Sequence, residues 1–161
     1  PDRPLPDEVA VIGAGTIGPD IGYYLKSAMP DCKLFLLDVV EGPLKLAQQR
    51  IVGYTQKALA KKKMKPQKAA AVSKNIVYTT DYEQIKNCKL VIEAATEDIP
   101  LKQKIFDMLE KIVAQDTIIT SNTSSIPADR LFLKMDNPQR TTVTHFLHYP
   151  LFRAGLAQSS G

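Results

Sequence analysis

The sequence is poor in cysteine and has no long apolar run. Its 161 residues include two cysteines, Cys32 and Cys88, whose spacing fits neither a metal site nor a redox motif. An isolated pair gives no disulfide framework, so we expect two packed thiols in a reducing compartment, the cytoplasm. No apolar stretch approaches the length needed to cross a bilayer. Residues 1–7 have neither the apolar core of a signal peptide nor an arginine-rich presequence pattern, and we expect a flexible leader there, although a removed targeting segment stays open.

The sequence also has only a small excess of positive charge. The net charge is +4, and its visible clustering lies between Lys57 and Lys68. One interpretation is the solvated end of a helix, where cations are favourable. The other is a surface that receives a polyanionic ligand. Because no aromatic residues interleave with these lysines and no nucleic-acid-binding motif is present, we expect no nucleic-acid partner.

The most informative segment, residues 9–18, reads VAVIGAGTIG. The apolar β-branched run predicts a buried parallel strand, and three glycines follow it at the spacing that holds a dinucleotide diphosphate. Gly13 would allow the tight turn, Gly15 the close approach of the phosphates, and Gly18 the close packing of the next helix against the sheet. Three spaced glycines alone are equally compatible with a structural turn.

The next units of the sequence favour the dinucleotide interpretation. Apolar residues recur at helical spacing from Ile21 to Met29, and a second apolar run, Leu34–Leu37, ends in Asp38. An acid at this position accepts both ribose hydroxyls of an adenosine half and repels a 2′-phosphate, so NAD is favoured over NADP. The alternative is an ordinary turn acid at the end of a strand.

Strand and helix patterns alternate along the whole chain. We predict a long helix from Pro43 to the lysines near Pro66 with Gly53 as a weak point, and a helix near Pro127 capped by Ser125. Further strands are predicted at residues 76–79, 89–94, 117–120 and 141–146, a brief capped helix after Asp81, and a helix over 101–113. This order predicts one α/β domain over residues 8–150, a Rossmann-like, doubly wound, mainly parallel sheet with helices on both faces.

Ligands of such sheets bind at the carboxyl ends of the strands. Polar residues follow two of the predicted strands, at 93–97 and 121–125, and His145 follows the last strand. A histidine beside hydroxyl groups in a dinucleotide fold can take a proton from an alcohol while a hydride leaves for nicotinamide. The alternative is a half-buried strand histidine next to a serine-rich turn and helix cap.

Together, the segments VIGAGTIG (11–18), VIEAATE (91–97), SNTSS (121–125) and HF (145–146) resemble the NAD-binding domain of the L-3-hydroxyacyl-CoA dehydrogenases of fatty-acid β-oxidation. The resemblance runs in order over residues 7–146. It implies NAD as cofactor, 3-hydroxyacyl-CoA as substrate, and reversible oxidation to the 3-oxoacyl-CoA. It also implies a homodimer for complete members. From the residue patterns themselves we expect no nucleic-acid, membrane or metal partner.

The resemblance implies roles for individual residues. His145 would be the general base and Ser124 would bind the substrate's 3-oxygen, while Thr55 and Lys62 would lie near coenzyme A. Asp38 would hold the adenosine ribose, and Glu97 and Lys102 would line the cofactor site near the nicotinamide ribose. The full set of implied cofactor contacts is Gly13, Ala14, Gly15, Thr16, Ile17, Gly18, Asp38, Ala94, Glu97, Lys102 and Asn122.

The sequence departs from the family pattern after His145. By position, His148 replaces the usual asparagine and Ala157 replaces the glutamate that orients the catalytic imidazole. No acidic residue follows Asp136, and without such a carboxylate the imidazolium loses stabilisation, so we expect low activity from this chain. Residues 151–161 are predicted to be an atypical tail, and the family's C-terminal helical domain is not in this sequence.

Two other functions stay open. One is a dinucleotide-binding module without chemistry of its own, and the other is a related hydroxy-acid or sugar-acid dehydrogenase that does not use coenzyme A. His145 and His148 could suggest a metal pair, but no third ligand is evident, so we expect no metal.

Overall fold

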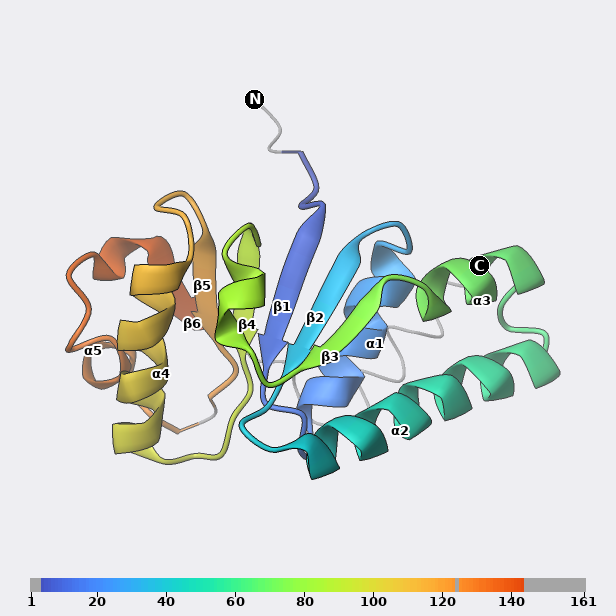
Figure 1. Cartoon of the computed structure of the whole chain (residues 1–161), viewed down its shortest axis with the longest axis horizontal. Coiled ribbons are helices and arrows are strands. Elements are labelled where there is room, and N and C mark those ends of the chain that lie inside the picture. Colours follow the sequence, from blue (N-terminus) through green and yellow to red (C-terminus); the bar gives the residue numbers. More distant parts are fainter. Residues whose placement is uncertain (1–3, 124, 144–161) are drawn as a thin grey trace.

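A single parallel sheet positions all other elements of the fold. The computed structural model describes residues 4–123 and 125–143, and within them six strands pair in the order β3-β2-β1-β4-β5-β6, every pair parallel. The strands are β1 (Glu8–Ile12), β2 (Lys33–Leu37), β3 (Ile76–Thr79), β4 (Leu90–Glu93), β5 (Ile118–Ser121) and β6 (Thr141–Val143). Figure 1 shows the strands side by side in this order.

Helices connect successive strands. They are α1 (Gly18–Ala28), α2 (Glu41–Ala60), α3 (Pro66–Ser73), α4 (Ile99–Ile112) and α5 (Ala128–Leu131), with short 3-10 turns η1 (Tyr82–Ile85) and η2 (Pro138–Arg140). In Figure 1, α2 and α3 gather at the β3 end of the sheet, and α4 and α5 at the β5–β6 end. The predicted fold class, a Rossmann-like sheet with helices on both faces, is confirmed.

The two faces of the sheet carry separate apolar cores. Val9 and Val11 of β1 pack with residues of α1, α2 and α3, whereas Ala10 and Ile12 pack with residues of α4 and α5. This is the expected result of a side-chain period of two in strands that are buried on both sides. It also explains why the strand sequences are continuous apolar runs rather than alternating ones.

Two local predictions need correction. The helix predicted to continue into the lysine run ends at Ala60, and a separate helix, α3, begins at Pro66. Proline is favoured in a first turn, because the N–H it lacks has no intrahelical partner there, so Pro66 starts a helix rather than merely ending one. Ser125 does not cap α5, whose N-cap residue is Pro127. The first part of the predicted last strand, 141–146, is confirmed as β6, and residues 144–146 lie outside the described residues.

Among the described helices, none combines the length and apolar character that a membrane span requires. The same residues contain no group of three or more histidine, cysteine or acidic side chains placed to hold a metal ion.

Candidate functional site

The candidate site lies where the strand order of the sheet reverses direction. β1 is at the centre, with β2 on one side and β4 on the other, and the connections from β1 and β4 leave toward opposite edges of the sheet. In doubly wound sheets the crevice at this point, beside the carboxyl ends of the strands, receives the ligand. The loop after β1 and the loop after β4 therefore define the site.

Gly13 ends β1 in a conformation that other residues rarely adopt. Its φ is +107°, and a Cβ atom there would lie 2.7 Å from the carbonyl oxygen of Ala94, in the neighbouring loop after β4. A Cβ at Gly18 would collide with the carbonyl of Gly13. These two glycines allow the loop to fold tightly between β1, β4 and the start of α1.

Gly15 has a different environment, because a Cβ atom there would meet nothing within 4 Å. The absent side chain therefore leaves open space beside the loop rather than relieving a clash. A diphosphate that approaches the backbone closely needs this space, and the residues present fit that group.

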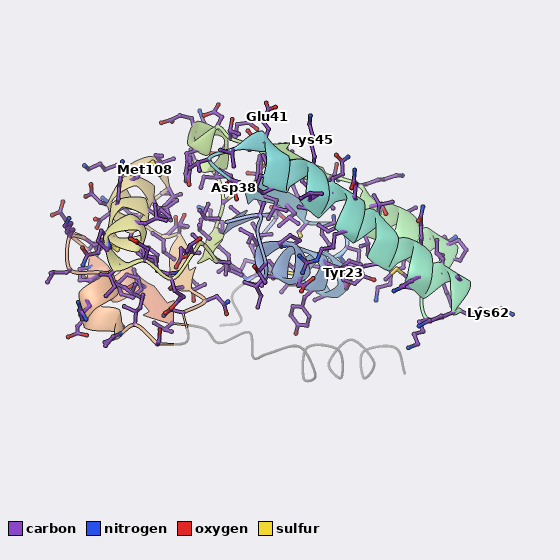
Figure 2. All side chains as sticks on the ribbon, turned by 90° about the horizontal axis from the view of Figure 1, so that it is seen from below. Tyr23, Asp38, Glu41, Lys45, Lys62 and Met108 are labelled. Atoms are coloured by element: carbon purple, nitrogen blue, oxygen red, sulfur yellow. The ribbon has the colours of Figure 1, made fainter. Side chains whose placement is uncertain are left out.

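Asp38 is attached directly to the same loop. Its Oδ2 accepts a hydrogen bond of 3.0 Å from the backbone N–H of Ala14, and its Oδ1 accepts one of 3.3 Å from the N–H of Val40. Figure 2 shows Asp38 where the chain passes from β2 toward α2, near Glu41. A carboxylate has about four acceptor positions, so these two bonds leave capacity for ribose hydroxyls.

A buried polar cluster lies at the carboxyl ends of β4 and β5. The ammonium of Lys102, from α4, is 2.6 Å from Oε2 and 2.9 Å from Oε1 of Glu93, and both side chains are fully buried. The Glu93 carboxylate also accepts hydrogen bonds from the hydroxyl of Ser121 and the N–H of Ala95, each 2.6 Å long. This buried charge is thus fully hydrogen-bonded, as burial demands.

Glu97 joins this cluster to the surface. Its Oε1 lies 3.1 Å from the Lys102 ammonium, and its Oε2 accepts hydrogen bonds from the hydroxyls of Thr123 and Ser125. Burial alone would raise the pKa of Glu97, but the bonds from Thr123 and Lys102 and the charge of Lys102 outweigh it, so the pKa is below its usual value of 4.5. Its side chain is 41% exposed, which leaves the carboxylate accessible.

The structure brings together most of the predicted cofactor residues. Ala94 meets the glycine-rich loop, Asn122 donates its backbone N–H to the Glu93 carbonyl, and Glu97, in the loop after β4, accepts a hydrogen bond from Thr123 in the loop after β5. Lys102 is in the same region, but its ammonium is enclosed by Glu93, Glu97 and the carbonyl of Ala95. It supports the site from within, and a direct contact with the cofactor stays a prediction.

The two predicted coenzyme A residues lie elsewhere. Lys62 is exposed in the turn after α2, and Figure 2 shows it at the far end of that helix from Asp38. A helix of 20 residues separates the two ends by about 30 Å. Thr55 is buried and its hydroxyl donates to the carbonyl of Ile51 in the same helix, so the structure does not present it to a ligand.

The predicted catalytic residues, Ser124 and His145, lie outside the described residues, as do His148 and Ala157. Sequence reasoning missed two residues that the structure places at the site. Glu93 was noticed only as a polar residue at a strand end, and Arg50, which contacts the glycine-rich loop, was not singled out. The signal for Arg50 was its spacing of four residues from Tyr54 on one helix face.

Several solved structures with a similar fold are dehydrogenases. The structure matches 3-hydroxybutyryl-CoA dehydrogenase from Escherichia coli with a TM-score of 0.85 and 24% identity, covering 98% of this chain and 36% of that one. It matches FadB2 from M. tuberculosis with a TM-score of 0.83 and 29% identity, covering 90% of this chain and 50% of that one. It matches (S)-3-hydroxybutyryl-CoA dehydrogenase from Ralstonia eutropha with a TM-score of 0.82 and 24% identity, covering 97% of this chain and 60% of that one. The chain therefore spans between about a third and three fifths of these relatives.

The family model described as "3-hydroxyacyl-CoA dehydrogenase, NAD binding domain" matches residues 8–151, which is nearly the whole chain. The resemblance noted from the sequence motifs is thereby confirmed, and so is NAD as the cofactor. The chain belongs to the 3-hydroxyacyl-CoA dehydrogenase family and represents its NAD-binding domain.

Proposed function

We propose that residues 13–18 and Asp38 hold NAD, and that the complete protein oxidises an L-3-hydroxyacyl-CoA to a 3-oxoacyl-CoA. The observation that carries the proposal is the hydrogen bond between Asp38 and Ala14, which fixes a ribose-binding acid against a loop whose Gly15 leaves open space. The diphosphate and the adenosine ribose of one dinucleotide would then be recognised by adjacent groups.

The proposed chemistry uses Ser124 and His145, which lie outside the described residues. NAD held by residues 13–18 and Asp38 would supply the acceptor for the hydride that leaves carbon 3 of the substrate. His145 would take the proton from the 3-hydroxyl group, and Ser124 would hydrogen-bond the same oxygen. These two roles rest on the family resemblance. Because Ala157 stands where the family resemblance places the orienting glutamate, a His145 imidazolium would lack that acidic partner, and we propose slow turnover by this chain.

We also propose that the lysines at the end of α2 receive the phosphates of coenzyme A. Lys61, Lys62 and Lys63 are exposed just beyond the carboxyl end of the helix, and flexible ammonium groups suit phosphates. Thr55, being buried, does not share in this support. A fatty-acid substrate, a cytoplasmic location and dimerisation are further parts of the proposal, supported by the family and by the two free buried thiols.

Calorimetric titration of this chain with NADH tests the cofactor site. The Asp38→Ala variant should bind NADH about ten- to a hundredfold more weakly, since it loses charge-assisted hydrogen bonds to the ribose. A Glu41→Ala variant removes a nearby acid of the same charge and should bind like the wild type. Unchanged affinity of the Asp38 variant, with native stability, would refute the site.

The substrate is tested by NADH formation from 3-hydroxybutyryl-CoA. Replacing Lys61, Lys62 and Lys63 with alanine should raise KM for the coenzyme A substrate severalfold and leave the Kd for NADH unchanged, because the two regions are about 30 Å apart. A KM that does not change would favour a dehydrogenase that does not use coenzyme A. If a version extended by a family C-terminal domain binds NADH yet forms no product, the chain is a binding module.

A further inference from the structure

Arg50 of α2 contacts the glycine-rich loop from outside the predicted NAD contacts. Its Nη2 donates a hydrogen bond of 2.8 Å to the carbonyl of Thr16, and its Nη1 donates one of 3.3 Å to the carbonyl of Gly15. More than thirty residues of sequence separate the arginine from the loop. The guanidinium therefore bridges two consecutive peptide groups of the loop.

This contact determines where the opposite sides of those peptide groups point. A trans peptide is planar, and its N–H points away from its carbonyl. With the carbonyls of Gly15 and Thr16 turned toward Arg50, the N–H groups of Thr16 and Ile17 point to the other side of the loop. Within residues 4–123 and 125–143, no hydrogen bond uses either of these N–H groups.

Two further side chains hold Arg50 in place. Asp20, in the first turn of α1, has Oδ2 only 2.7 Å from Nη2 of Arg50. The hydroxyl of Tyr54 accepts a bond of 2.9 Å from Nε of Arg50 and donates one of 2.6 Å to Oδ1 of Asp20. The Tyr54 ring lies 5.2 Å from that of Tyr23, which restricts its movement. The three polar side chains form a closed set of hydrogen bonds between α1, α2 and the loop.

The charges of this set are balanced. Burial acts to lower the pKa of Arg50, but hydrogen bonding to Tyr54 and the charge of Asp20 outweigh it and raise that pKa, so the guanidinium stays protonated. Asp20 is itself largely buried and compensates this positive charge at close range. The pair therefore adds little net attraction for an anion, and its effect on the loop is one of orientation.

We propose that Arg50, held by Asp20 and Tyr54, is a positioning residue that presets the N–H groups of Thr16 and Ile17 for the NAD diphosphate. The inference rests on the proposed function, in which this loop holds the diphosphate. An arginine is suited to the task because its planar fork can donate to two neighbouring carbonyls at once, whereas a lysine ammonium acts as a single point charge.

Calorimetry with NADH and with ADP-ribose, which shares the diphosphate, tests the role of Arg50. Arg50→Ala should weaken the binding of both ligands about tenfold, and Arg50→Lys should recover only part of the loss. Lys57→Ala removes the same charge from an exposed position on the same helix and should have no effect. Wild-type affinity in Arg50→Ala, or full recovery in Arg50→Lys, would overturn the proposal.

Asp20→Asn separates orientation from simple attraction. The substitution keeps the shape of the side chain and makes the surroundings of the loop more positive. Attraction by charge would then tighten NADH binding, whereas loss of positioning weakens it severalfold, and we expect weaker binding. Tighter or unchanged binding would overturn the proposal.

The NADH affinities of the Asp38 and Arg50 variants together distinguish a wrong cofactor site from a wrong role for Arg50. If Asp38→Ala and Arg50→Ala both bind NADH like the wild type, the glycine-rich loop is not the cofactor site. If Asp38→Ala weakens binding and Arg50→Ala does not, the cofactor site stands and only the role of Arg50 is wrong.

Discussion

Glu93 and Lys102 form a fully buried ion pair that joins β4 to α4, with the ammonium 2.6 Å from Oε2 of the carboxylate. Both groups come from elements that border the candidate site. Ser121 and Ala95 complete the hydrogen bonding of Glu93, so the pair also connects β5 and the loop after β4. The position of Glu97 depends on this arrangement, because Lys102 contacts both carboxylates.

Breaking the pair should be strongly destabilising. Lys102→Met leaves the Glu93 carboxylate buried without its counter-ion, and we expect the free energy of unfolding to fall by about 3–5 kcal/mol. Lys89→Met is the matched control, since its pair with Asp116 is exposed, and it should change stability by about 1 kcal/mol or less. Urea unfolding of both variants measures the difference. Equal losses would mean that the buried pair contributes no more than a surface pair.

Gly13 and Gly15 should respond differently to alanine. Gly15→Ala should keep the wild-type free energy of unfolding, because the new Cβ meets open space, yet it should weaken NADH binding at least tenfold by occupying the path of the diphosphate. Urea unfolding and calorimetry on the same sample check this. Native affinity in Gly15→Ala would contradict the proposed loop site.

Gly13→Ala should instead lower stability itself. A positive φ strains alanine, and its Cβ would press on the backbone of Ala94, so we expect a loss of about 2 kcal/mol or more. Gly42→Ala is the control, because a Cβ there also meets nothing within 4 Å. The melting temperature of Gly42→Ala should not fall. A comparable fall in both variants would show that the turn at Gly13 does not specifically require glycine.

Acid should remove the stabilisation that Glu97 provides. Its pKa is lowered in the folded protein, so its contribution is present above pH 4.5, the usual pKa, and is lost as the pH falls through the lower folded value. The stability difference between the wild type and Glu97→Gln should therefore shrink between pH 6 and about pH 3. Urea unfolding at several pH values gives this difference. A stability difference that is independent of pH would show that the charge of the Glu97 carboxylate does not stabilise the fold.

The Cys88 thiol should be unreactive in the folded protein. Burial raises its pKa to about 12, and the side chain is fully enclosed, so almost no thiolate forms near pH 8. Mass spectrometry after iodoacetamide treatment should show no label on Cys88 until the protein is unfolded, when both cysteines should react. Rapid labelling of native protein would mean that this part of the core opens readily.

Much of the fold could be predicted because its signals are local. The run 9–12 followed by Gly13 and Gly15, and the run 34–37 ending in Asp38, specify strands and turns within a few residues. Helix α3 was not predicted, because its sequence is short and alanine-rich and carries a weak apolar period. Ser125 matched a helix cap in sequence, but its hydroxyl instead donates to Glu97, 28 residues away.

The sequence by itself determined the alternation of strands and helices, the glycine-rich turn and the acid that follows β2, since apolar periodicity and backbone conformation act over neighbouring residues. Only the tertiary structure decided that Lys102 is enclosed by Glu93 and Glu97, and that Arg50, paired with Asp20, contacts the glycine-rich loop. These contacts join residues that different helices and strands bring together. A charged side chain has the same local sequence signal whether its partner is water or a buried counter-ion, and packing alone selects between them.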